Sequence, residues 1–195
     1  MIIRKLFKFE GSHIVRDCTS LRCSRSLHGH SYEVEIFLTS RSLDNGQMVV
    51  DFGLLKGTVK DFIDSFDHTH VMWDKESEED KNFFKGYNER WIELPCSPSA
   101  EMLSLMFFAV LDDIIKNTEF NNGEKGVRLA AVRVHETRTG WAESSFEDMA
   151  FWKWNLDDIK ISQSIRDEWK DPEMWDNLLD GIPFVNPKVD LKFSK

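Results

Sequence analysis

The sequence contains few cysteines and has no long apolar run. The three cysteines, Cys18, Cys23 and Cys96, are an odd and small number for a chain of 195 residues. We therefore expect no disulfide framework and infer a reducing compartment, with the cytoplasm as the simplest location. No stretch approaches the roughly 20 consecutive apolar residues that a membrane span requires. Charged residues already stand at positions 4 and 5, and no apolar run of the length needed for a signal peptide follows, so we expect no signal peptide.

The sequence also lacks an excess of positive charge. It has 34 acidic and 25 basic residues, a formal net charge of −9. Because nucleic-acid-binding proteins usually present a basic face, we expect no nucleic-acid partner, and the missing span argues against a membrane partner. Net charge does not describe a local pocket, so a small anionic substrate is still compatible with this composition. The 15 Phe and 7 Trp provide enough large side chains for a sizeable core.

Hydrophobic periodicity predicts two pairs of strands that flank two helices. The first helix follows Asp51, a good N-cap, and the second follows Ser99 in the same role. The order β-β-α-α-β-β is an α+β pattern and not a parallel series of strand–helix–strand units. The charged segment 75–90 is interpreted as a surface insertion. The predicted strands are 2–9, 30–39, 127–137 and 142–154, with an additional short strand over 91–94, and the predicted helices are 52–66 and 99–114.

The end of the chain lacks the regular hydrophobic periodicity of the first 154 residues. Three prolines divide the segment after residue 154 into short pieces, although a helix is expected over 157–169. We therefore predict a main domain over 1–154 and a C-terminal extension over 155–195. The side chains expected to pack this extension on the main domain are Trp169, Met174, Trp175 and Phe184.

Three histidines suggest a metal site near the start of the chain. His28 and His30 are two residues apart on an expected strand, so their side chains project from the same face. If the first two strands form a hairpin, His13 at the end of the first comes opposite this pair. Three imidazoles leave one position open on Zn²⁺, which is typical of a catalytic zinc site. His28-Gly29-His30 alone is weak evidence, because two exposed strand histidines explain it equally well.

The neighbouring residues provide groups that can move protons. Cys23 lies on a loop close to His28 and to basic side chains, which favour the thiolate that acts as a base or nucleophile. Cys18 is an alternative for the same role. Asp67 precedes His68 directly, and a carboxylate that hydrogen-bonds an imidazole fixes its tautomer and raises its basicity. Cys23, Asp67 and His68 are therefore candidate catalytic residues, although an inert buried cysteine and an Asp-His pair in a loop after a helix are the structural alternatives.

Glu136 ends the third predicted strand. A carboxylate in this position can accept two parallel hydrogen bonds from a planar N–C–N edge, such as that of a pterin or a guanine. An exposed acid at a strand end is the simpler explanation of Glu136 taken alone.

Together these residues resemble the 6-pyruvoyltetrahydropterin synthase family, which includes the bacterial 6-carboxytetrahydropterin synthases of queuosine biosynthesis. The resemblance covers the chain up to about residue 150. Each fragment is common, but six fragments in the correct order are specific. The matching fragments are Phe9-x-x-x-His13, Cys23 with His28-Gly29-His30, Gly46-x-Met48-Val49-Val50-Asp51-Phe52, Asp67-His68, Pro98-Ser99-Ala100-Glu101 and Glu136-Thr137.

The resemblance implies the tunnelling fold, a four-stranded antiparallel sheet with two helices on one face. It also implies a homo-trimer or homo-hexamer with active sites between subunits. The implied substrate is 7,8-dihydroneopterin triphosphate, and the implied cofactor is Zn²⁺. Residue by residue, it implies zinc ligands at His13, His28 and His30, the catalytic residues named above, and pterin binding by Glu136. Ser99 and Glu101 match the helix start that helps to line the pterin pocket.

The resemblance leaves the product open. The spacing between Cys23 and His28 lies between those typical of the carboxy-forming and the pyruvoyl-forming members. We predict a 6-carboxy-5,6,7,8-tetrahydropterin synthase, a lyase that releases triphosphate and acetaldehyde. The alternatives are a 6-pyruvoyltetrahydropterin synthase and a non-catalytic pterin-binding relative. A structural zinc protein is a weaker alternative.

Overall fold

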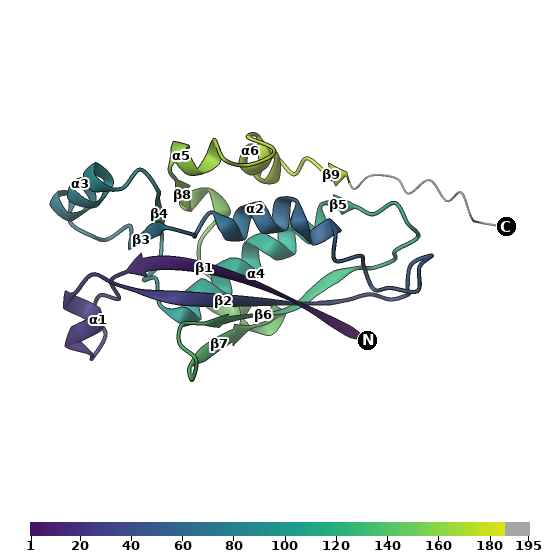
Figure 1. Ribbon diagram of the computed structural model, residues 1–195, viewed down its shortest axis with the longest axis horizontal. Helices are drawn as coiled ribbons and strands as arrows, with labels where there is room; N and C mark the ends of the chain where they lie inside the picture. Colours follow the sequence, from purple (N-terminus) through teal and green to yellow (C-terminus); the bar gives the residue numbers. More distant parts are fainter. Residues whose placement is uncertain (186–195) are drawn as a thin grey trace.

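A sheet of seven strands forms the frame of the protein (Figure 1). The computed structural model describes residues 1–185. The strand order is β7-β6-β2-β1-β3-β4-β8, and β1 and β2 pair along their whole length as an antiparallel hairpin. The strands are β1 (Ile2–His13), β2 (His28–Thr39), β3 (Thr69–Trp73), β4 (Trp91–Leu94), β6 (Arg128–His135), β7 (Trp141–Ser144) and β8 (Lys160–Ile161).

The number of strands corrects the expectation from the sequence. The four long predicted strands correspond to β1, β2, β6 and β7, which are antiparallel neighbours, and the short strand expected over 91–94 is β4. However, β3, β4 and β8 extend the sheet beyond β1, and β3 is parallel to both β1 and β4. The prediction of a four-stranded, wholly antiparallel sheet is therefore wrong. The strand β3 is short and almost entirely buried, so it lacks the alternation of polar and apolar residues that reveals a half-buried strand.

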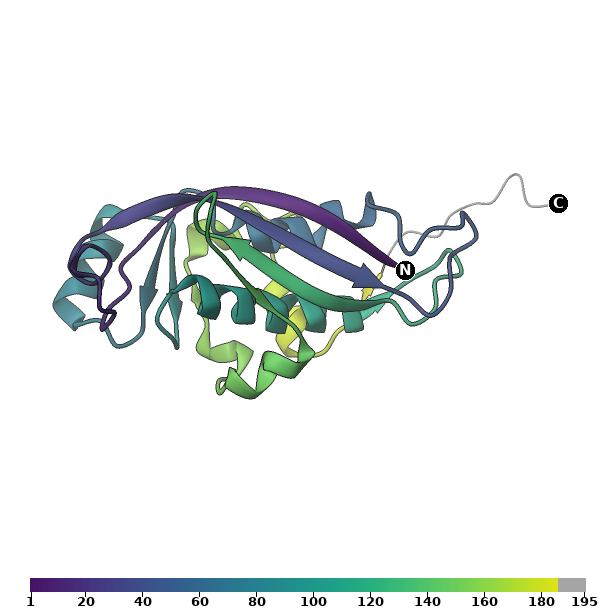
Figure 2. The same ribbon diagram turned by 90° about the horizontal axis from the view of Figure 1, so that it is seen from below.

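Two helices, α2 (Thr58–Asp64) and α4 (Ala100–Lys116), cover one face of the sheet. The ring of Phe9 in β1 lies 5.7 Å from that of Phe66, just after α2, and 6.1 Å from that of Phe107 in α4. Because one inward-facing side chain of β1 contacts both neighbours, the two helices pack on the same face. Figure 2 shows the long strands arching over α4. The predicted α+β class is therefore confirmed.

Two predicted elements begin or end elsewhere in the structure. The first helix begins at Thr58 and not near Asp51, because Asp51 accepts a hydrogen bond of 2.7 Å from the Gly53 amide and so caps a separate turn. That turn continues as the 3₁₀ helix η1 (Leu54–Lys56). The predicted strand over 142–154 is too long, because β7 ends at Ser144 and the 3₁₀ helix η2 (Phe146–Phe151) follows.

Two further helices lie in the connections between strands. The short helix α1 (Leu21–Arg25) lies between β1 and β2. The helix α3 (Glu78–Tyr87) occupies most of the segment interpreted as a surface insertion. Ser77 caps α3, and three acidic residues in its first turn face the positive end of the helix dipole. Within residues 1–185, no helix combines the length and the apolar character needed to cross a membrane.

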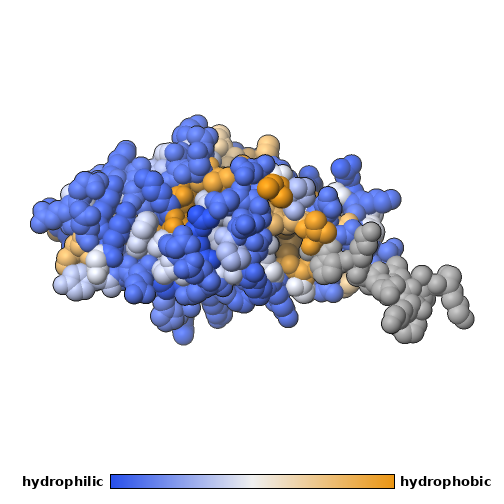
Figure 3. Space-filling model, turned by 90° about the horizontal axis from the view of Figure 1, so that it is seen from above, coloured by the Kyte–Doolittle hydropathy of each residue, from blue (hydrophilic) through white to orange (hydrophobic). Residues whose placement is uncertain are grey.

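The described part of the C-terminal extension consists of short elements, so the predicted helix over 157–169 is wrong. Trp169, Met174 and Trp175 are buried in the main core, and Trp175 stacks on Phe62 of α2 with ring centroids 5.8 Å apart. Hydrophilic residues predominate on the surface that α5 and α6 share (Figure 3). These elements are η3 (Leu156–Asp158), β8, α5 (Gln163–Arg166), α6 (Met174–Leu179) and β9 (Phe184–Val185), which pairs with β5 (Thr118–Glu119).

The division of the chain at residue 154 stays a prediction, and residues 186–195 of the predicted extension lie outside the described residues. Replacing Trp175 with alanine tests whether the extension contributes to the main core. We expect the free energy of unfolding to fall by about 3–5 kcal/mol, because the substitution leaves a cavity beside Phe62. Urea denaturation followed by circular dichroism measures this loss. Trp141, which is 54% exposed, is the control, and its alanine variant should lose less than about 1 kcal/mol.

Candidate metal centre and active site

The hairpin of β1 and β2 brings three histidines together. Its register places His13 opposite His28, and Gly11 opposite His30. One ring nitrogen from each of His13, His28 and His30 lies within 4.8 Å of the others. Gly29 allows this close pairing, because a Cβ atom there would lie 2.7 Å from the Gly11 carbonyl oxygen. The three side chains can therefore bind one metal ion, as the sequence predicts.

The chemistry of the donor set also fits a metal. The Nδ1 atom of His13 lies 2.7 Å from the Pro98 carbonyl oxygen, and that of His28 lies 2.8 Å from the Ser26 carbonyl oxygen. A carbonyl that accepts the Nδ1 proton leaves Nε2 free for a metal and orients the ring. Burial lowers the pKa of His13 to about 4 and also lowers that of His30, which keeps both rings neutral. The neutral imidazole is the form that binds metals.

The Glu136 carboxylate lies beside this triad. Its Oε1 atom is 3.6 Å from the Nε2 atom of His13 and 3.8 Å from that of His30. Glu136 directly follows β6, so its predicted position at a strand end places it next to the histidines. Its side chain is 31% exposed. A carboxylate in this place can contact a ligand that also reaches the metal site.

The Asp67-His68 pair forms the expected contact. The Oδ2 atom of Asp67 lies 3.0 Å from the Nδ1 atom of His68, while Oδ1 accepts a hydrogen bond of 2.8 Å from the Glu10 amide. Burial raises the pKa of Asp67, but the Glu10 amide, His68 and Arg90 together outweigh it, so the net shift is downward. The carboxylate is therefore ionised and can hold the His68 ring in one tautomer.

A cavity of about 360 Å³ connects the pair to the triad, because His68 and His30 both line it. The other lining residues come from the ends of β1, the start of β2 and Thr69. The structure thus brings one residue from each of two separately predicted groups to one cavity, His30 of the histidine triad and His68 of the Asp67-His68 pair. A substrate in this cavity could contact both groups at once.

Cys23 and Cys18 lie on the same connection between β1 and β2. Cys23 belongs to α1 and is partly buried, and its carbonyl oxygen accepts a hydrogen bond of 2.9 Å from the Val15 amide. Cys18 is also partly buried, and its thiol donates to the Ser20 carbonyl oxygen at 3.3 Å. Both thiols are partly buried and neither lines the cavity that His68 and His30 share, so the catalytic role of Cys23 and the alternative of Cys18 stay predictions that variants must decide.

The start of α4 contacts the triad through its backbone. Ser99 is the N-cap, and its hydroxyl accepts a hydrogen bond of 3.3 Å from the Met102 amide, while Glu101 is an exposed residue of the first turn. The contact with the triad comes instead from the Pro98 carbonyl oxygen, which accepts from His13. The predicted roles of Ser99 and Glu101 in pterin binding stay predictions.

Two further side chains near the site, Tyr32 and Arg16, make contacts that only the tertiary structure reveals. The Tyr32 hydroxyl lies 3.3 Å from both ring nitrogens of His13, which the strand alternation alone did not suggest. Arg16 donates from Nε to both carboxylate oxygens of buried Glu76 at 2.9 Å, and from Nη1 to the Ser24 carbonyl oxygen at 3.2 Å. This pair fixes the turn that carries Cys23, and only tertiary structure brings its members together.

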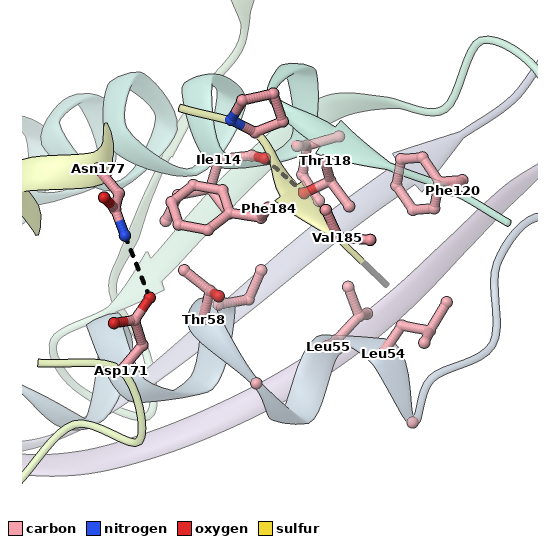
Figure 4. Close-up of a pocket in the computed structure, with 15 residues that line it drawn as sticks. Leu54, Leu55, Thr58, Ile114, Thr118, Phe120, Asp171, Asn177, Phe184 and Val185 are labelled. Atoms are coloured by element: carbon pink, nitrogen blue, oxygen red, sulfur yellow. Dashed lines mark hydrogen bonds between the residues drawn. The ribbon is translucent and has the colours of Figure 1, made fainter. Parts of the chain in front are cut away.

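A second cavity, of about 420 Å³, lies away from the histidines (Figure 4). Mostly apolar side chains from η1, α2, the end of α4 and β9 line it, including Leu55, Ile114 and Phe184. None of the predicted site residues lines this cavity. The histidine triad and its adjoining cavity are therefore the better candidate for the active site.

The pH dependence of stability provides a test of the buried histidines. Burial lowers the pKa of both His13 and His70 to about 4, from 6.5. Between these values the unfolded chain takes up protons that the folded protein does not, so stability is full above pH 6.5 and is lost toward pH 4. Each of the two rings should account for a loss on the order of 2 kcal/mol in the free energy of unfolding across this pH range. Denaturant titrations of metal-free protein measure the loss, and His70→Asn should show about half of it.

Comparison with known proteins identifies the family. The model of the 6-pyruvoyl tetrahydropterin synthase family matches residues 2–147. The 6-carboxy-5,6,7,8-tetrahydropterin synthase of Helicobacter pylori strain J99 is 41% identical over 183 residues, 92% of each chain. A putative 6-carboxy-5,6,7,8-tetrahydropterin synthase of Archaeoglobus fulgidus is 31% identical over 73% of this chain and 94% of its own. The chain therefore belongs to the 6-pyruvoyl tetrahydropterin synthase family, which confirms the resemblance seen in the sequence.

Solved structures agree with the fold. An uncharacterised protein from Wolinella succinogenes superposes with a TM-score of 0.58 at 22% identity, over 75% of this chain and 98% of its own. The 6-pyruvoyl tetrahydropterin synthase of Plasmodium vivax gives a TM-score of 0.52 at 20% identity, over 74% of this chain and 97% of its own. At these identities the likeness supports the shared fold of the main domain.

Proposed function

We propose that the protein converts 7,8-dihydroneopterin triphosphate and one water molecule to 6-carboxy-5,6,7,8-tetrahydropterin, with release of triphosphate and acetaldehyde. The observation that carries this proposal is the 41% identity, over 92% of both chains, to a protein named for this activity. The converging histidines and the adjoining cavity provide a site for it. The reaction makes the protein a lyase in the formation of 7-deazapurine precursors such as that of queuosine.

His13, His28 and His30 would hold the metal, for which we propose Zn²⁺ because three imidazoles suit a catalytic zinc site. When bound, this ion supplies a Lewis acid that acidifies the protons of the substrate side chain. Glu136 accepts two hydrogen bonds from the N–C–N edge of the pterin and so orients the ring. Ser99 and Glu101 line the pterin pocket at the start of α4.

Two groups move the protons. Cys23, as thiolate, removes a proton from the substrate side chain. His68 relays protons on the other side, and Asp67 holds its ring with Nδ1 toward the carboxylate, 3.0 Å away. The left-handed backbone of His68, with φ of 53°, and its amide hydrogen bond to the Glu10 carbonyl oxygen keep the ring at the cavity wall.

The proposal includes a homo-trimer or homo-hexamer with active sites between subunits. Within residues 1–185, the part of β1 before Gly11 pairs with β2 on one edge and with no strand on the other. The strand β7 likewise has a free outer edge. Open edges favour pairing with another chain, which supports this assembly. The three free cysteines support a cytoplasmic location, where thiols stay reduced.

Product analysis tests the proposed reaction. The zinc-loaded protein is incubated with 7,8-dihydroneopterin triphosphate, and the pterin and aldehyde products are identified by mass spectrometry. We expect 6-carboxy-5,6,7,8-tetrahydropterin and acetaldehyde in equal amounts. A 6-pyruvoyl product without acetaldehyde would establish the alternative activity that gives the family its name. Pterin binding without turnover would establish a non-catalytic relative.

A further inference from the structure

The turn that carries Asp67 and His68 is held from one side by an arginine. Arg90, the last residue before β4, donates from Nε to the Asp67 carbonyl oxygen at 3.0 Å. Its Nη2 donates to the Asp64 carbonyl oxygen at 3.2 Å and to that of Ser65 at 3.5 Å. These carbonyls lie at the end of α2, where they also accept from the Asp67 amide and from the Thr69 hydroxyl, respectively. One guanidinium thus spans the whole turn from the helix to the catalytic pair.

This turn needs support from its surroundings. His68 has a φ of 53°, in the left-handed region that residues with a Cβ atom rarely adopt. Such a conformation costs about 1 kcal/mol or more and persists only where neighbouring contacts fix it. Backbone contacts of Glu10 fix one side of the turn, since its carbonyl oxygen accepts from the His68 amide and its amide donates to Asp67 Oδ1. On the other side, the Asp67 carbonyl oxygen accepts from Arg90 at 3.0 Å and from the Thr69 hydroxyl at 3.2 Å.

Arg90 is itself held by an ion pair with a residue of the C-terminal extension. The Oε2 atom of Glu168 lies 2.6 Å from Nη1 of Arg90, whose side chain is only 19% exposed. The next residue, buried Trp169, donates from its indole Nε1 to the Ser65 hydroxyl at 2.8 Å. The extension therefore reaches the end of α2 with two adjacent side chains, and both act on the turn that leads to Asp67.

We propose that Arg90 is a positioning residue for the Asp67-His68 pair, and that Glu168 of the C-terminal extension holds Arg90 in place. This gives the extension a role in the reaction although it carries none of the predicted catalytic residues. The catalytic part of the inference rests on the proposed function. The structural part, that Arg90 fixes the orientation of the His68 ring, does not depend on it.

The charges around Arg90 agree with this role. Its guanidinium is near Asp67, whose ionised form it favours, and it forms the ion pair with Glu168. A cavity of about 530 Å³ beside the turn is lined by Arg90, His68 and Glu168, together with Asp64, Lys8 and Lys60. Lys60 pairs with Asp64 and Lys8 with Glu33, so neither lysine replaces Arg90 as the partner of the turn.

The side-chain spectrum of His68 tests this inference without any measurement of turnover. Zinc-loaded protein with ¹⁵N-labelled histidine gives ring signals for its six histidines, and a His68→Gln variant assigns that of His68. In the wild type, we expect His68 to show a single tautomer with the proton on Nδ1. In Arg90→Ala, we expect an average of both tautomers, and in Glu168→Gln a smaller shift in the same direction. Unchanged His68 signals in a folded Arg90→Ala protein would overturn the inference.

Kinetics provide the second readout. Arg90→Ala should lower kcat about 10-fold with KM changed less than 2-fold, because a displaced base slows proton transfer and leaves pterin binding intact. Arg90→Lys keeps the charge but loses the planar fork, so it should recover only part of kcat. Asp176→Asn is the matched control, because it breaks the Arg166–Asp176 ion pair of the same extension away from Asp67.

The two readouts separate the possible failures. If the wild-type protein shows no turnover while Arg90→Ala changes the His68 signal, the proposed function fails and the positioning role stands. If Asp176→Asn lowers kcat as much as Glu168→Gln, the extension contributes only general stability and the inference is wrong. If Arg90→Ala does not fold, Glu168→Gln decides by its His68 signal, since it removes only one charge.

Discussion

Replacing His30 with alanine is expected to weaken metal binding by more than about 100-fold, because even the loss of an outer-shell partner costs roughly 10–100-fold. Only two of the three converging imidazoles would remain. Turnover should fall by about 1,000-fold or more, since a Lewis-acid contribution of several kcal/mol corresponds to such a factor. Metal content after gel filtration and competition with a chelator measure the first effect, and steady-state kinetics the second.

His135 provides a matched control for this variant. Its side chain has the same 22% exposure as that of His30, and it also lies near a carboxylate, Glu35, at 3.2 Å. His135→Ala should therefore keep both metal content and turnover near the wild-type values. Equal metal loss in the two variants would show that the metal is bound elsewhere, and retained metal in His30→Ala would exclude His30 as a ligand.

Replacing Cys23 with alanine is expected to lower kcat by about 100–10,000-fold, the usual contribution of a general base. The metal content should not change, because the three histidine ligands do not include this residue. Circular dichroism should show a folded protein, since Cys23 is only partly buried on a short helix. Single-turnover measurements separate the effect on chemistry from any effect on substrate binding.

Cys18→Ala is the control for Cys23, because both cysteines are partly buried on the same connection. We expect Cys18→Ala to keep most of the activity. If instead Cys18→Ala is inactive and Cys23→Ala is active, the thiol base is Cys18. Full activity of both variants would show that neither thiol takes part and that proton removal depends on the Asp67-His68 pair.

The convergence of the three histidines could be predicted from the sequence because it follows from strand geometry. Residues two apart on a strand share a face, so His28 and His30 were expected to converge. The hairpin register then places His13 opposite His28, as the sequence suggested. The Asp67-His68 pair is adjacent in sequence, and its contact of 3.0 Å follows from that adjacency. The approach of Glu136 to His13 could not be derived from local geometry, because it depends on how β6 pairs with β2.

Features that depend on distant contacts could not be predicted. The strand β3 is short and almost entirely buried, so it shows no alternation of polar and apolar residues, and it is defined by its pairing with β1 and β4. Arg90 belonged to a charged segment that was interpreted as a surface insertion. Its guanidinium instead contacts carbonyls more than twenty residues earlier in the chain. Polar contacts of this kind leave no periodic signal in a sequence.

A crystal structure of the zinc-loaded protein with a bound pterin tests the proposed site most directly. Anomalous diffraction at the zinc edge should show one peak, about 2.0–2.1 Å from one ring nitrogen of each of His13, His28 and His30. The pterin should lie with its N–C–N edge on the Glu136 carboxylate and its side chain toward the metal. A zinc peak away from these histidines, or a pterin bound without Glu136, would contradict the proposed active site.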